Sequence, residues 1–143
     1  MDQCIYHTEA IRRAAPSTFV IGDMPFGSYQ AGTEAAVQNA ARFHKEAAVD
    51  AVKLEGGKRV ARVIQAITEG GMLCMGHLGL TPQSSNALGG FKAQGLTAES
   101  AIDVIEDARA VHEAGAFSIL IEAVPPEVTK RSFVTSCPSR SIQ

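Results

Sequence analysis

Apolar residues recur along this chain with two periods, one typical of helices and one typical of strands. Between residues 60 and 69 they follow the i, i+3, i+4, i+7 spacing of an amphipathic helix, at Val60, Val63, Ile64 and Ile67. Further helices are predicted over residues 5–14, 33–47 and 97–114, and from residue 124 onward. Thr33 and Thr97 are the expected N-caps of two of them. The inner side of helix 97–114 is expected to hold Ala101, Ile102, Ile105, Ala108 and Val111.

Four short β-rich segments separate these helices, at residues 18–23, 51–55, 72–76 and 117–122. In the first of them we expect Phe19, Ile21 and Asp23 to face inward. The alternating order of strand and helix predicts an α/β fold, with about four βα units and a parallel sheet joined by crossover helices.

The strand Ala51–Glu55 has an unusual distribution of charge. Alternate side chains share a face, so Val52 and Leu54 point one way while Lys53 and Glu55 point the other way. Charges so close to a buried strand need partners, a metal ion or a wet cleft. An edge strand with one solvated face is the alternative interpretation of this segment.

Polar residues recur where the predicted strands end. Residues 46–55 can be aligned with residues 113–122 as a faint repeat, and both segments finish with glutamate. Asp23, Glu55, His77 and Glu122 all fall at or near strand ends, the place where parallel α/β sheets assemble their sites. Any one of them could simply cap the next helix, but four together favour a shared site.

The chemistry of these residues suits a charged substrate. Asp23 and Glu55 are hard oxygen donors that could hold Mg²⁺. Lys53 offers a fixed positive charge to a carboxylate or a developing enolate, and Glu122 could transfer protons. His77 could be a second acid/base group, could orient a ligand, or could be a structural histidine hydrogen-bonded to the long loop that follows it.

Composition limits the possible classes of protein. The chain has 143 residues, 45% of them hydrophobic, with a net charge of −2, and lacks the basic excess of a nucleic-acid-binding protein. No apolar run approaches the roughly 20 residues of a membrane span, so no membrane partner is expected. Cys4, Cys74 and Cys137 are far apart, which favours a reducing compartment. We expect a cytoplasmic protein, or a mitochondrial one if the source is eukaryotic and an N-terminal part is missing.

Several motifs occur in a fixed order: Gly22-Asp-Met-Pro-Phe26, Val52-Lys-Leu-Glu-Gly-Gly57, Gly76-His-Leu-Gly-Leu-Thr-Pro-Gln-Ser84, Gly89-Gly-Phe-Lys-Ala-Gln-Gly95 and Ala114-Gly-Ala-Phe-Ser-Ile-Leu-Ile-Glu-Ala-Val-Pro125. Together they closely resemble the ketopantoate hydroxymethyltransferase (3-methyl-2-oxobutanoate hydroxymethyltransferase) family, from about Tyr6 to Arg131. The resemblance implies a (β/α)₈ TIM barrel of the phosphoenolpyruvate mutase and isocitrate lyase type, and a homo-oligomer.

The resemblance also implies an activity in pantothenate and coenzyme A biosynthesis. A hydroxymethyl group would pass from 5,10-methylenetetrahydrofolate to 3-methyl-2-oxobutanoate through a Mg²⁺-stabilised enolate, giving 2-dehydropantoate. By motif, Asp23 resembles a residue that touches both metal and ketoacid, and Lys53 resembles the substrate-binding lysine. Glu55 resembles a metal-associated acid, and Glu122 resembles the catalytic proton acceptor.

The chain also departs from this family. A complete barrel needs about 250 residues, so this chain is expected to supply only strands three to six. Another metal-binding aspartate and a substrate-binding serine would belong to the absent first strands. Residues 1–131 are interpreted as a partial barrel domain, and residues 132–143 as a disordered tail foreign to the family, from a frameshift, splice variant or faulty gene model.

Two alternatives remain open at this point. The chain could be a truncated, non-catalytic product that at most associates with full-length subunits. It could also be another Mg²⁺-dependent ketoacid lyase of the same superfamily, although the run from His77 to Ser84 argues against that.

Overall fold

Strands and helices alternate along the chain in the computed structural model, which describes residues 1–136. The strands are β1 (Ile21–Asp23), β2 (Ala51–Glu55), β3 (Leu73–Gly79) and β4 (Ser118–Glu122). The helices are α1 (Asp2–Ala14), α2 (Thr33–Ala47), α3 (Ala61–Glu69), α4 (Ala98–Glu113) and α5 (Pro126–Ser136), with a 3₁₀ turn, η1 (Pro82–Ser84). The predicted α/β alternation is therefore confirmed.

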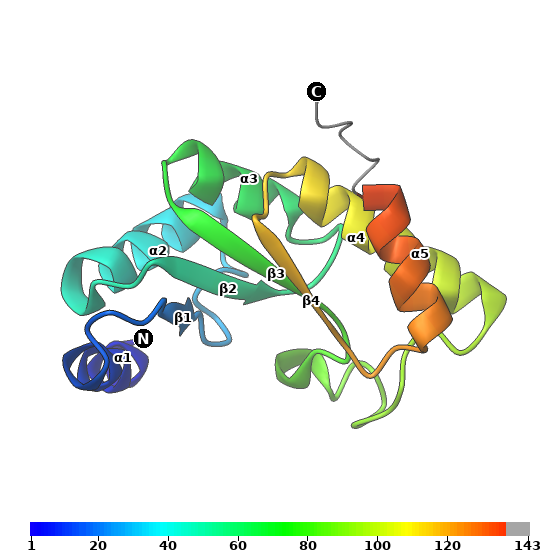
Figure 1. Ribbon diagram of the computed structural model, residues 1–143, viewed down its shortest axis with the longest axis horizontal. Coiled ribbons are helices and arrows are strands. Elements are labelled where there is room, and N and C mark those ends of the chain that lie inside the picture. Colours follow the sequence, from blue (N-terminus) through cyan, green and yellow to red (C-terminus); the bar gives the residue numbers. More distant parts are fainter. Residues whose placement is uncertain (137–143) are drawn as a thin grey trace.

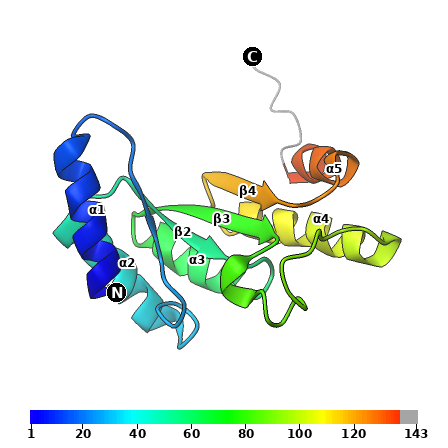
Figure 2. The same ribbon diagram turned by 90° about the horizontal axis from the view of Figure 1, so that it is seen from below.

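The four strands form one parallel sheet in the order β1-β2-β3-β4, with helices on one side of it (Figure 1). Neighbouring helices pack in chain order, α1 against α2 and so on to α5 against α4. As Figure 2 shows, α1 and α5 lie at opposite ends of the molecule. Every connection between neighbouring strands passes through a helix, as parallel pairing requires.

The core lies between the sheet and these helices. Val52 and Leu54 of β2 are fully buried there, as the alternation along that strand predicts. Burial of Cys74 in the same core raises the pKa of its thiol to about 12, which makes it a packing residue and not a nucleophile. At Gly76 a β-carbon would collide with the Val111 side chain, so this glycine lets α4 approach β3 closely.

The opposite face of the sheet is partly open. Phe19 is 53% exposed on this side, whereas Val20 and Met24 are buried against the helices. The expectation that Phe19, Ile21 and Asp23 face inward is therefore wrong for the core under the helices, because the alternate residues, Val20 and Met24, are the buried ones. The rings of Phe19 and Phe117 lie with centroids 5.8 Å apart, although they precede the two outermost strands. The sheet is thus curled about its open face.

Some element boundaries differ from those predicted. β3 continues to Gly79, so His77 lies within the strand and not at its end. Thr33 is the first helical residue of α2, and Gly32 occupies the N-cap. Thr97 does cap α4, and it forms a capping box with Ser100. On α4 the buried residues are Val104, Ala108 and Val111, while Ile102 is exposed.

The sequence is expected to leave the family pattern after Arg131, but this position lies inside a helix. α5 continues to Ser136, and the buried Ser132 donates a hydrogen bond from Oγ to the carbonyl of Val128 (3.0 Å). Residues 132–136 are therefore helical, and the rest of the expected tail, residues 137–143, lies outside the described residues. The domain division at residue 131 stays a prediction. No helix in the described part of the chain is long and apolar enough to cross a membrane.

Candidate functional site

The polar residues singled out in the sequence meet on the open face of the sheet. Asp23 is in register with Lys53, and Glu55 is in register with His77. Glu122 is in register with Gly79, one step further along the same face. Because residues in register on parallel strands point to the same side, the pairing of the sheet itself brings these side chains together.

Lys53 is at the centre of this cluster. Its Nζ lies 3.0 Å from Asp23 Oδ1 and 3.7 Å from Glu55 Oε1. The Nδ1 atom of His77 is 3.4 Å from the same Nζ. The lysine side chain is only 15% exposed, so the two carboxylates compensate a charge that is largely removed from water.

His77 connects the two glutamates. Its side chain is buried, with Nδ1 3.5 Å from Glu55 Oε1 and Nε2 3.0 Å from Glu122 Oε2. The second contact is within ion-pair distance but is not aligned as a hydrogen bond. Glu122 is 43% exposed, so its carboxylate faces solvent on one side and the imidazole on the other.

Glu55 is held by Tyr29 and Gln83, two residues that no pattern in the sequence marks as part of a site. The backbone N–H of Gln83 donates to Glu55 Oε2 (2.9 Å), and its side-chain amide donates to the carbonyl of Met24 (3.0 Å). The Tyr29 hydroxyl accepts from the backbone N–H of Glu55 (3.2 Å) and donates to Gln83 Oε1 (2.9 Å). Burial raises the pKa of Tyr29 to about 12, so the hydroxyl remains a donor at neutral pH.

The sequence offered only an indirect signal for these two residues. Tyr29 lies in the loop after β1, and Gln83 lies in the short turn η1 after β3. Neither segment is long enough for a periodicity that would mark a buried side chain. A carboxylate that is only 4% exposed must accept hydrogen bonds from somewhere. That requirement, together with the polar run after His77, is what could have pointed to Gln83.

The residues present fit part of a magnesium site. Asp23 is 57% exposed and could bind a cation directly. Glu55 has one oxygen on Gln83 and the other facing Lys53 and His77, which suits it to orient a ligand or a water molecule. Among the described residues no group of three or more His, Cys, Asp or Glu side chains is arranged to hold a metal ion. The metal assignments to Asp23 and Glu55 stay predictions.

Comparison with known proteins gives a consistent result. The sequence profile of the family described as ketopantoate hydroxymethyltransferase matches residues 1–136, past Arg131 to the end of α5. A 3-methyl-2-oxobutanoate hydroxymethyltransferase from Alkaliphilus metalliredigens is 65% identical over 130 residues, which are 91% of this chain and 46% of that relative. The enzyme of the same name from Syntrophobacter fumaroxidans is 55% identical over 128 residues, 90% of this chain and 45% of the relative.

A third relative of the same name matches nearly the same share of this chain. The enzyme of that name from Emericella nidulans is 50% identical over 128 residues, 90% of this chain and 37% of the relative. The chain therefore spans about half the length of the curated relatives it matches, or less. Because the family profile covers nearly the whole sequence, this chain belongs to the ketopantoate hydroxymethyltransferase family.

Proposed function

We propose that this chain carries the ketoacid-binding and proton-transfer residues of a 3-methyl-2-oxobutanoate hydroxymethyltransferase. In this reaction 3-methyl-2-oxobutanoate, 5,10-methylenetetrahydrofolate and water give 2-dehydropantoate and tetrahydrofolate. The observation that carries the proposal is the Lys53 ammonium, held between Asp23 and Glu55 on the same face as Glu122. The relatives' names state the acceptor and the group transferred; the folate donor comes from the family resemblance.

Lys53 is suited to bind the ketoacid. Its Nζ lies within 4 Å of three neighbours, and its side chain is only 15% exposed, so water screens its charge weakly. The same charge would stabilise the enolate oxygen that forms as C3 loses its proton. A preorganised cation of this kind costs little reorganisation at the moment of reaction.

Glu122 is the proposed acceptor of the C3 proton. Its carboxylate is open on one side and is backed by His77 on the other (Nε2 to Oε2, 3.0 Å). If Lys53 donates to Nδ1 of His77, the neutral imidazole carries its proton on Nε2, facing Glu122. His77 would then orient the base without itself touching the substrate.

Mg²⁺, when bound, would supply a second positive charge beside the ketoacid oxygens. Asp23 would hold it directly, and the remaining ligands would be water, the ketoacid and residues outside this chain. Asp23 would then contact both metal and ketoacid, and Glu55 would position the lysine and the metal's water.

We also assign the curled sheet to part of a (β/α)₈ barrel of the phosphoenolpyruvate mutase type. The support is its strictly sequential parallel order, the helices on one side only, and the contact between Phe19 and Phe117 across the open face. In such a barrel the open face would become the interior, and Lys53, His77 and Glu122 would face the mouth.

The test is exchange of the C3 proton of 3-methyl-2-oxobutanoate in D₂O with Mg²⁺, followed by NMR. This measurement requires no folate. We expect exchange with the intact chain and a loss of at least about a hundredfold in Glu122→Gln, because the general base is removed. Glu113→Gln, on the exposed end of α4, is the matched control and should exchange at the original rate. Equal rates in Glu122→Gln and the original chain would rule out the proposed base.

A non-catalytic role is the second candidate. The observation that favours it is the open face of the sheet, where apolar side chains such as Phe19 and Leu73 are exposed. A chain of this kind would associate with other subunits and contribute nothing to turnover by itself. A folded chain that catalyses no proton exchange would favour this role.

A further inference from the structure

A cavity of about 640 Å³ lies beside the candidate site, outside the cluster of Lys53 and His77. It is lined by the segment after β1, by the first turn of α3 and by η1, and the buried Glu55 also lines it. Its volume falls within the roughly 300 to 1,000 Å³ that is usual for small-molecule sites. None of the proposed roles of Lys53, His77 and Glu122 uses this space.

The wall of this cavity combines cations with aromatic rings. Arg59 and Arg62 line it, and neither forms a salt bridge with another described residue. Phe26 is largely exposed at its edge, and the buried Tyr29 forms part of the floor. Exposed guanidinium groups and an exposed aromatic ring in the wall of one cavity suit a ligand with carboxylates and a flat ring system.

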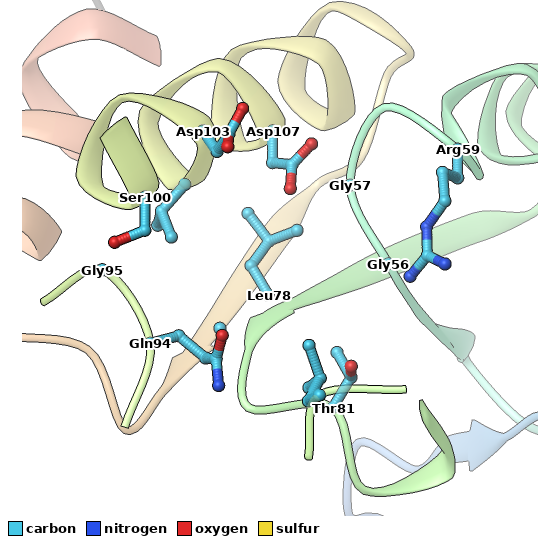
Figure 3. Close-up of a pocket in the computed structure, with 13 residues that line it drawn as sticks. Gly56, Gly57, Arg59, Leu78, Thr81, Gln94, Gly95, Ser100, Asp103 and Asp107 are labelled. Atoms are coloured by element: carbon cyan, nitrogen blue, oxygen red, sulfur yellow. The ribbon is translucent and has the colours of Figure 1, made fainter. Parts of the chain in front are cut away.

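A neighbouring cavity does not match such a ligand. It has about 180 Å³, and Figure 3 shows that Asp103 and Asp107 project towards it from α4. Burial raises the pKa of Asp107, although its Oδ1 accepts a hydrogen bond from the backbone N–H of Lys58 (2.8 Å). Arg59 lines both cavities. The smaller cavity has one arginine and two carboxylates in its lining and lies below the usual size of a small-molecule site, whereas the larger has two arginines and one carboxylate. The larger cavity is therefore the better candidate for an anionic ligand.

We infer that the larger cavity binds the anionic one-carbon donor, with its carboxylates at Arg59 and Arg62 and its one-carbon end towards Glu55. This inference rests on the proposed function, because it takes the donor to be a tetrahydrofolate. Glu55 is the connecting residue, since one of its oxygens is held by Gln83 at the cavity and the other faces Lys53 and His77. A donor bound in this cavity would therefore be separated from the ketoacid site only by the side chain of Glu55.

The test is calorimetric titration of the full chain with tetrahydrofolate carrying one or five glutamates. In the double variant Arg59→Gln/Arg62→Gln we expect the Kd to rise at least about tenfold, since two charge-assisted contacts are lost. The rise should be larger for the pentaglutamate form. Arg109→Gln, an exposed arginine of α4 outside the cavity, is the matched control and should leave the Kd unchanged.

Three results would overturn the inference: a double variant that binds like the original chain, no binding by the original chain, or equal competition by a pentaglutamate peptide without the ring system. Folding of each variant is checked by its thermal melting curve. The C3 exchange reaction separates this inference from the proposed function, since the arginine variants should retain it. A chain that lacks exchange but shows the arginine-dependent Kd would sustain the cavity assignment and contradict the catalytic proposal.

Discussion

At the scale of single residues, Asp50 links α1 to the start of the sheet. Its Oδ2 accepts a hydrogen bond from the backbone N–H of Val20 (2.8 Å) and contacts the Arg12 guanidinium. The same arginine donates to the carbonyls of Thr18 and Ala48, both at 2.9 Å. The Val20 hydrogen bond and then Arg12 hold the pKa of Asp50 below its usual value near 4.

A carboxyl group with a lowered pKa in the folded state contributes stability above its unfolded pKa and loses it as the pH falls. We therefore expect Asp50→Asn to melt at a lower temperature than the original chain at pH 7. The gap between the two melting temperatures should close as the pH falls below about 4. Thermal melting of both proteins between neutral and acidic pH measures this. A gap that stays constant with pH would show that Asp50 acts through neutral hydrogen bonds alone.

Residues on regular strands could be predicted more fully than residues in loops. The period of two placed Lys53 and Glu55 on the face opposite Val52 and Leu54, because alternation is a local property of the backbone. Tyr29 reaches Glu55 only through tertiary contacts. No local pattern reports such a contact, so the residues that hold Glu55 in place could not be derived.

At the scale of elements, boundaries depend on neighbours as well as on residue type. Thr33 and Thr97 both looked like N-caps, but only Thr97 has a partner, Ser100, that completes a capping box. At the start of α2, Gly32 adopts φ 148° and takes the capping position instead. β3 extends past its expected end because its pairing with β4 continues to Gly79. The residue pattern within β3 alone cannot reveal this pairing.

The aligned segments 46–55 and 113–122 both place a left-handed residue directly after or close after the end of a helix. Ala48, the C-cap of α2, has φ 49°, and its counterpart Gly115 has φ 94°. Left-handed backbone favours glycine, so the alanine is strained and the glycine is not. The repeat seen in the sequence is thus a repeat of helix end, left-handed turn and strand.

This comparison predicts opposite effects for two reciprocal substitutions. Ala48→Gly should stabilise the chain by about 0.5 kcal/mol or more, because the strain at this exposed position is relieved. Gly115→Ala should destabilise it by about 1 kcal/mol or more, since strain is introduced. The new β-carbon would also lie 3.0 Å from Thr68 Oγ1. Urea unfolding measures both, and the same sign for the two changes would contradict the argument.

At the scale of the whole molecule, the curl of the sheet could not be predicted. Local patterns gave the number and order of the strands, but they carry no information on the angle between them. The contact between Phe19 and Phe117 joins segments far apart in the sequence, and it depends on the twist accumulated across all four strands. The same curl leaves β1 and β4 as edges that no other described strand covers.

An uncovered sheet face and two free strand edges favour association with a second copy of the chain. Leu73 is exposed on that face, whereas Ile102 is exposed on the helical side. We expect the chain to sediment as more than a monomer, with a dissociation constant that rises about tenfold in Leu73→Ser, since a buried leucine contributes roughly 1.5–3 kcal/mol. Ile102→Ser removes an equally apolar side chain from the other surface and should leave association unchanged. A chain that remains monomeric at high concentration, or an equal effect of the two substitutions, would contradict association through the open face.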